Sequence, residues 1–258
     1  VFFKKMQARE RRGIHFGAIF GLGLIIGLIG GYFLIGDNLA LHLGKGYAQH
    51  PFSLFERLIS EARVLVFYLS QLIYPTPDRF SLFHDIPISS SLVSPWTSLT
   101  SIIAIICAIG AGLYQLKKMP LISFAVLFFF INHLIESSII PLRLAFEHRN
   151  YLPSMFIFLI PATYILSVFR AYKNTNARMY SLLTGFFALF IILIACGTYI
   201  RNFDWSDEKT LMLDSIQKAP KLHEPYQNLA LQHIKVGEFD VGINLLMQSL
   251  NYATRAND

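Results

Sequence analysis

The chain has 258 residues, of which 54% are apolar and only 15% are charged, whereas an ordinary soluble domain carries about 25% charged residues. The mean hydropathy is +0.48, and the apolar residues gather in long runs, which is typical of membrane spans and argues against one large soluble core. The net charge of +6 does not indicate a nucleic-acid partner, because the basic residues stand at the ends of apolar runs, where they set membrane orientation.

The chain begins with Val1, and we interpret it as a fragment that lacks an N-terminal portion. Its two cysteines, Cys107 and Cys196, lie far apart inside apolar runs. We therefore expect them to be small buried hydrophobic residues and predict neither a disulfide nor a metal site.

The first predicted span covers residues 14–35 and follows a cluster of basic residues between positions 4 and 12. It is long enough to cross about 30 Å of hydrocarbon. Its glycines recur at four-residue spacings, which either lets another helix approach closely or reflects the ordinary tolerance of glycine in membrane helices. These glycines are Gly17, Gly21, Gly23, Gly27 and Gly31.

Residues 54–75 are mostly apolar but include Glu56, Arg57, Glu61 and Arg63. Charges are costly in lipid unless they are paired or face protein, and Arg57 and Glu61 are spaced to pair on one helix face. The charges either line an access route for a lipid-linked phosphate or form a network that braces helices. The segment could span the membrane, re-enter it or lie at its interface.

Four further spans are predicted at about 97–116, 119–135, 152–169 and 179–200, which gives about five in all. With the first basic cluster in the cytoplasm and no net crossing by 54–75, Lys117, Lys118 and the basic link 170–178 also lie inside. Residues 136–151 and everything after Arg201 then lie outside. If 54–75 is a full span, both basic links move outside instead.

Residues 201–258 are amphipathic, and we interpret them as the start of a tetratricopeptide-repeat domain that follows a membrane domain at 1–200. With His223 as the first position of a repeat, the packing positions are filled by Tyr226, Leu229, Ala230, Gly237 and Leu246. Gly242 stands where alanine is usual. Because one repeat cannot bury its own apolar face, we expect either further repeats or packing on the membrane domain. The fold class is therefore all-α, a polytopic helical bundle followed by a helical hairpin.

The densest group of chemically active residues is the stretch from Glu147 to Ser154, E-H-R-N-Y-L-P-S, just before a span. Glu147 could accept a proton or bind a metal, His148 could share that work, and Arg149 could hold a phosphate. The alternative is the start of an interfacial helix, with Tyr151 as an aromatic anchor.

Two smaller candidates are the neighbours His84 and Asp85, which could instead form a plain turn, and His133 with Glu136, which could cap a helix. No phosphate-binding glycine loop, dinucleotide fingerprint, metalloprotease motif or nucleophile elbow occurs in the sequence.

The segments 55–75, 84–92, 136–142 and 147–154 together resemble bacterial membrane proteins with tetratricopeptide repeats, which are similar to the transmembrane and tetratricopeptide repeat-containing O-mannosyltransferases of the GT-C superfamily. The resemblance covers about residues 1–250, and E-H-R-N-Y-L-P-S is its most specific part.

The resemblance implies an inner-membrane enzyme that transfers a sugar, with mannose expected, from a polyprenyl-phosphate carrier to protein Ser or Thr on the outer face. Its general base, an Asp or Glu, is expected upstream of Val1, so the fragment alone is expected to be inactive. Arg149 or Arg63 would contact phosphate, and periplasmic repeats would hold the acceptor. No cofactor is expected here, and a divalent metal in the complete enzyme stays open. The alternatives are a non-catalytic repeat scaffold for envelope assembly and an O-antigen ligase-like enzyme.

Overall fold

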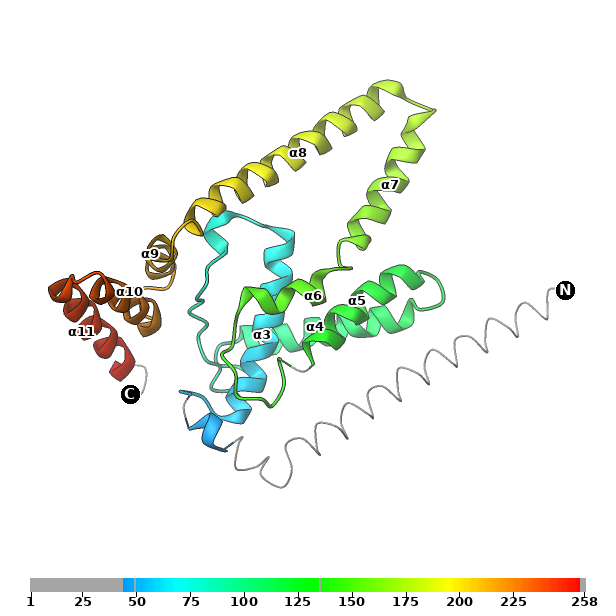
Figure 1. Cartoon of the computed structure of the whole chain (residues 1–258). Coiled ribbons are helices and arrows are strands. Elements are labelled where there is room, and N and C mark those ends of the chain that lie inside the picture. Colours follow the sequence, from blue (N-terminus) through cyan, green and yellow to red (C-terminus); the bar gives the residue numbers. More distant parts are fainter. Residues whose placement is uncertain (1–43, 49, 135, 256–258) are drawn as a thin grey trace, which may run out of the picture. The chain divides into compact units, whose positions relative to one another are not determined.

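The computed structural model describes residues 44–48, 50–134 and 136–255, and within these ranges the regular structure is entirely helical. The chain divides into two compact units, Val1–Gln49 and His50–Asp258, and the second holds all elements discussed below (Figure 1). The predicted span at 14–35, with its glycines and the preceding basic cluster, lies outside the described residues.

Helix α3 runs from Leu54 to Ile73. It begins at a capping box, in which the Ser53 hydroxyl accepts from the Glu56 amide while the Glu56 side chain accepts from the Ser53 amide, a reciprocal arrangement that satisfies two helix-end donors. Its C-cap residue is Tyr74, directly ahead of Pro75. The charged residues Arg57 and Glu61 are buried on one of its faces.

Two described helices are long and apolar enough to cross a membrane, α4 (Thr97–Tyr114) and α8 (Ala177–Asp204). A third crossing is formed if η3 (Glu147–Asn150) with α6 (Tyr151–Ser154) and α7 (Leu159–Lys173), which are bent by 50° relative to one another, act as one broken span. The bend precedes Pro161, which has no amide hydrogen for the Ile157 carbonyl.

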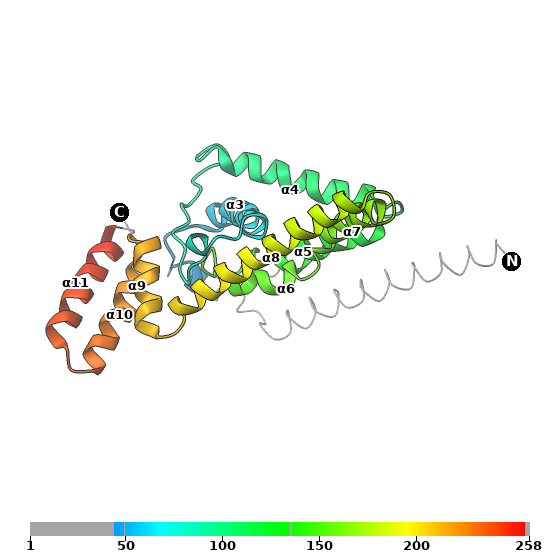
Figure 2. The ribbon, with the colours of Figure 1, turned by 90° about the horizontal axis from the view of Figure 1, so that it is seen from above.

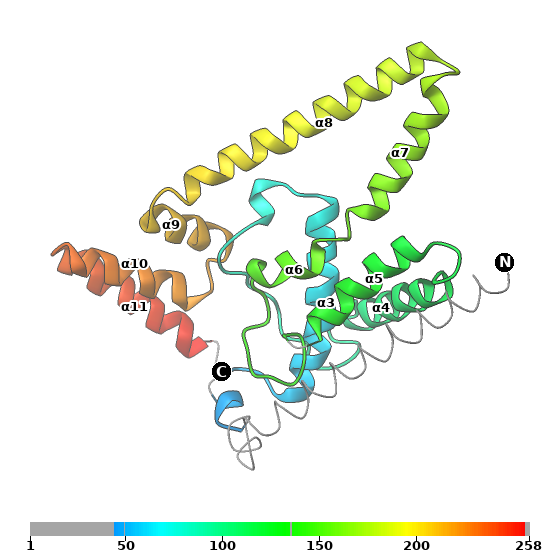
Figure 3. The same ribbon diagram turned by 45° about the vertical axis from the view of Figure 1, so that its right-hand side comes forward.

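Helix α5 (Pro120–His133) has 14 residues and reaches only about 21 Å, short of the hydrocarbon thickness of about 30 Å. It packs between α4 and α6 (Figure 3). The described helices thus provide two or three candidate spans, and the predicted total of five is not confirmed.

The candidate spans expose apolar side chains along their length, and no residue of α7 or α8 is buried. This is the pattern expected where lipid replaces water as the surrounding medium. Cys107 in α4 and Cys196 in α8 are both exposed. The expectation that they are buried is therefore wrong, because an apolar environment in lipid requires no burial within protein.

The C-terminal segment forms α9 (Glu208–Lys218), α10 (His223–Lys235) and α11 (Phe239–Arg255), which lie side by side (Figure 2). Helix α10 ends at Gly237, which has φ of +85°. Its amide donates to the Ile234 carbonyl and the Glu238 amide donates to the His233 carbonyl, a glycine-dependent helix end.

The hairpin of α10 and α11 buries Tyr226, Leu229 and Ala230, and Leu246 is half-buried. A Cβ atom on Gly242 would lie 2.5 Å from Ile234 Cγ1, so this crossing has no room for alanine. The hairpin has the helix lengths of a tetratricopeptide unit, and its assignment as a repeat stays a prediction.

Candidate functional site

Three segments that are distant in sequence meet in the second unit: the connection 74–96 between α3 and α4, the connection 134–150 between α5 and α6, and helix α9. Apolar packing joins the first to the C-terminal helices, because Phe83 is buried in one cluster with Leu211, Met212 and Leu229. Hydrogen bonds and ion pairs between the three segments add to this packing. Residues of the first segment and of α9 line a small pocket there.

The pocket has a volume of about 190 Å³, comparable to about six water molecules. It combines two aromatic rings with groups of both charges, and it is lined by Phe67, Asp78, Arg79, Ser81, Phe83, His84, Asp85, Ile86 and Lys218. Such a mixture suits a small polar ligand that also presents an apolar face.

His84 and Glu147 form the most specific contact at this pocket. The His84 Nε2 atom lies 2.9 Å from Glu147 Oε1 although the two residues are 63 positions apart. The same oxygen accepts the Ser81 amide at 2.7 Å, and the Phe67 ring meets the His84 ring edge-on, with centroids 5.1 Å apart. The carboxylate and the imidazole are thus held in a fixed mutual orientation.

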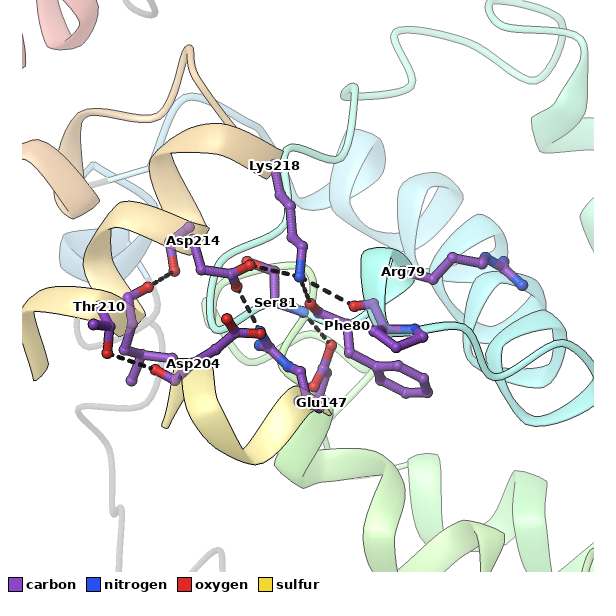
Figure 4. Close-up of polar contacts among 12 residues, drawn as sticks. Arg79, Phe80, Ser81, Glu147, Asp204, Thr210, Asp214 and Lys218 are labelled. Carbon is purple, nitrogen blue, oxygen red and sulfur yellow. Dashed lines mark hydrogen bonds and ion pairs between the residues drawn. The ribbon is translucent and has the colours of Figure 1, made fainter. Parts of the chain in front are cut away.

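Lys218 of α9 holds residues 77–86, the pocket loop, against that helix (Figure 4). Its ammonium donates to the carbonyls of Pro77 and Phe80 at 3.1 and 2.8 Å and pairs with Asp214 at 2.7 Å. Because these three contacts use all its donors, Lys218 shapes the pocket wall and is not a free cation. Asp214 also pairs with Arg201 at 2.6 Å, which links this anchor to the end of α8.

A second connection to the C-terminal helices is made by Arg143, whose guanidinium pairs with Glu224 of α10 and lies 5.2 Å from the centre of the Phe83 ring. Burial and the neighbouring Arg149 lower the pKa of Arg143. The hairpin is therefore held to the 134–150 connection by a charge pair as well as by the Phe83 cluster.

The charged group of α3 forms a bracing network. The buried Arg57 pairs with Glu61 at 2.8 Å and donates to the carbonyls of Glu136, Ser138 and Leu142. Burial raises the pKa of Glu61 to about 7, although the adjacent Arg57 opposes the shift. This geometry favours bracing over phosphate access for Arg57, because its donors are used by backbone.

Arg63 is half-buried farther along α3 and donates to the Pro87 carbonyl at 2.7 Å. Burial lowers its pKa. On the same helix the Tyr68 hydroxyl donates to the Phe146 carbonyl and accepts the Phe146 amide, both at 2.8 Å. Burial raises the pKa of Tyr68. These contacts join the middle of α3 to both loops.

The residues of E-H-R-N-Y-L-P-S are divided between different surroundings. Arg149 lies 3.4 Å from Glu136 and donates to the Arg143 carbonyl. His148 is exposed, stacks on the Phe146 ring and does not line the pocket, and Tyr151 is also exposed. Of this stretch, only Glu147 is brought to His84.

Asp85 and His133, the remaining candidates from the sequence, lie in different surroundings. Asp85 is exposed and lines the pocket beside His84. His133 is buried at the end of α5, where Nδ1 contacts the Phe129 carbonyl and the ring lies 5.6 Å from that of Tyr68. This environment corresponds to a structural histidine at the end of the helix.

Lys218, Arg79 and Phe83 were not singled out in the sequence. Lys218 sits on an ordinary amphipathic helix, and Arg79 ends the short 3-10 helix η2 (Pro77–Arg79), so neither carries a local signal. Phe83 is one of 23 phenylalanines. The only usable signal was His84-Asp85 in the same loop, which marked the right segment without indicating what packs on it.

No three His, Cys, Asp or Glu side chains gather as metal ligands anywhere in the described ranges. No protein-family model, curated protein or solved structure matches this chain. The functional assignment therefore depends on the pocket, on the segments that form it and on the helices long enough to cross a membrane.

Proposed function

We propose that the complete protein is a membrane glycosyltransferase, which moves a sugar from a polyprenyl-phosphate carrier to Ser or Thr of a protein on the outer face. The observation that carries the proposal is the pocket with the His84–Glu147 contact, where two connections between helices meet helix α9. The resemblance of E-H-R-N-Y-L-P-S to the O-mannosyltransferases supplies the reaction class.

The lining of the pocket supports a carbohydrate ligand. Phe67 and Phe83 add apolar surface to the lining for one side of a sugar ring, whereas carboxylates and Arg79 suit its hydroxyls. Arg79 already donates to the carbonyls of Ser70 and Tyr74. It therefore forms part of the pocket wall in addition to offering a cation to the ligand.

The contacts among the connections support the proposed orientation. If α5, although shorter than a full span, returns the chain after α4 and α8 returns it after α7, the segments 74–96, 134–150 and 204–218 lie on one side, which agrees with the hydrogen bonds between them. Lys117, Lys118 and the link 170–178 then lie together on the other side, which the positive-inside rule makes cytoplasmic.

The position of α3 supports the absence of a net crossing at 54–75. Arg57 in its first turn bonds carbonyls in the segment 136–142, and Tyr68 in its second half bonds Phe146. Both halves of the helix thus contact the same connection. A helix that crossed the membrane would bring its two ends to opposite sides.

The test is transfer by the full-length protein in proteoliposomes that contain radiolabelled mannosyl polyprenyl phosphate. Membrane proteins from cells that lack this protein serve as acceptors. We expect protein-bound label that alkaline β-elimination releases, as for sugars linked to Ser or Thr. Glu147→Ala, measured at equal amounts of folded protein, should lower the transfer. If neither mannosyl nor other glycosyl carriers give protein-bound label, the proposal is wrong.

A repeat scaffold is the second candidate, and one observation favours it. Helix α11 exposes a stripe of apolar side chains at helical spacing, formed by Ile243, Met247 and Leu250. An exposed apolar stripe marks a surface that can bind another helix. The same transfer assay separates the two functions, because a scaffold gives no protein-bound label.

A further inference from the structure

We propose that His84, oriented by Glu147, is the base that accepts the proton of the acceptor hydroxyl, so that this chain supplies its own general base. The inference rests on the proposed glycosyl transfer. It differs from the expectation of a carboxylate upstream of Val1, because it assigns the proton transfer to a contact within the described residues.

The contact with Glu147 determines which nitrogen of His84 can act as a base. A carboxylate accepts hydrogen bonds and does not donate them when ionised, so the 2.9 Å contact places the proton of a neutral imidazole on Nε2. The Nδ1 atom then carries the lone pair. No residue that the structure describes forms a hydrogen bond to Nδ1, so this atom is free to accept a proton.

Glu147 is itself held in place, which makes it a positioning residue. Its Oε1 atom accepts the Ser81 amide at 2.7 Å in addition to the imidazole, and Ser81 is buried. Phe67 contacts the ring edge of His84. Turning the imidazole over by 180° would break the Glu147 contact, so this contact fixes the position of the two ring nitrogens before a ligand arrives.

His84 lies among charged groups of both signs. The pocket is lined by Asp78, Asp85 and Arg79 and by Lys218 from α9, and Glu147 contacts the His84 ring. Lys218 is neutralised in part by Asp214. The pocket therefore offers both carboxylates and cations to a polar ligand.

The acceptor O–H bond breaks and its proton moves to His84 Nδ1 while the oxygen forms a bond to the anomeric carbon. The bond from that carbon to the carrier phosphate oxygen breaks, and the phosphate leaves with the electron pair. The imidazolium then returns its proton to water, which restores the neutral ring.

The kinetic test uses the full-length protein and the mannosyl carrier assay. His84→Gln should lower kcat by about a hundredfold or more, as expected when a general base is lost, with KM for the carrier changed little. Wild-type kcat should fall at low pH, and this fall should be absent in the variant. His148→Gln, exposed and outside the pocket, is the matched control and should retain both rate and pH profile.

The second test needs no turnover. In protein labelled with ¹⁵N at histidine and held in detergent, the neutral His84 ring should carry its proton on Nε2. Glu147→Gln places against the ring an amide that can both donate and accept a hydrogen bond, so the ring proton should distribute over both nitrogens. The larger the share of the Nδ1–H form, the lower kcat should be.

The outcomes separate the two proposals. Wild-type transfer that survives in His84→Gln, or a neutral wild-type ring protonated at Nδ1, overturns the role of His84 and leaves glycosyl transfer intact. Absence of transfer by the wild-type protein overturns the proposed function and this role with it. Reduced transfer in His84→Gln together with the Nε2–H form in the wild type supports both.

Discussion

Arg57 is the residue on which the 134–150 connection depends most. Its fully buried guanidinium bonds three backbone carbonyls and one carboxylate. The sequence indicated its pairing with Glu61 through their spacing of four. It could not indicate the carbonyl partners, because backbone acceptors leave no trace in the identity of the residues that carry them.

Arg57→Met should lower the free energy of unfolding by about 3–5 kcal/mol, because it leaves a buried carboxylate and several carbonyls without their partner. The measurement is unfolding of the purified protein in mixed micelles with increasing denaturing detergent. Arg63→Met is the control and should cost less, because Arg63 is half-buried and bonds fewer backbone carbonyls. Equal losses in both variants would contradict the bracing role.

Glu61 should make the stability depend on pH. Its pKa in the folded protein is about 7, above the ordinary value of 4.5, so the folded state holds the proton more tightly than the unfolded state. The stabilising contribution is complete below pH 4.5 and is lost as pH rises through about 7. The melting temperature should therefore fall over this interval in the wild type. In Glu61→Gln that part of the fall should be absent; an unchanged slope would contradict the assignment.

Among elements, the apolar helices were the most predictable part. The predicted span at 97–116 corresponds to α4, and the one at 179–200 to α8, which continues to Asp204. The bend between α6 and α7 and the short length of α5 were not predicted. Hydropathy reports how apolar a segment is, but not where a helix breaks within it.

The crossing of α10 and α11 gives a prediction for Gly242. Alanine has the higher helix propensity, by about 1 kcal/mol, but its Cβ would lie 2.5 Å from Ile234 Cγ1 and 3.1 Å from the Ala230 carbonyl oxygen. Gly242→Ala should therefore destabilise the hairpin by about 1–3 kcal/mol, the usual cost of overpacking. Thermal unfolding followed by circular dichroism measures the change.

The matched background is Ile234→Ala, which removes the obstructing atoms. In that background Gly242→Ala should be neutral or stabilising, because only the propensity difference and the carbonyl contact remain. A loss of the same size in both backgrounds would show that the contact with Ile234 is not the cause.

Phe83 gives the prediction for how the pocket loop is held to the C-terminal helices. Phe83→Ala removes the ring that packs with Leu211, Met212 and Leu229 and should cost about 3–5 kcal/mol. Amide hydrogen exchange should increase together in residues 77–86 and 208–218. Val93→Ala, an exposed position in the same connection, is the control. Faster exchange in the loop alone would contradict joint packing.

For the whole molecule, the sequence indicated an all-helical chain with membrane spans and an amphipathic C-terminal segment. It also marked Glu147 and His84 separately. It did not indicate that these two residues meet, because they belong to different connections and the contact depends on how α3, η3 and α9 pack. Long-range pairing of this kind leaves no local periodicity, and no aligned relatives constrain it.

Cysteine labelling in intact cells tests most directly whether the segments that form the pocket share the outer side of the membrane. In a background with Cys107 and Cys196 replaced by alanine, single cysteines are placed at the exposed positions Ser90, His148, Ser206, Lys117 and Asn174. A membrane-impermeant maleimide should label the first three in intact cells, and the last two only after lysis. Labelling of Lys117→Cys or Asn174→Cys in intact cells, or protection of any of the first three, would contradict the proposed site.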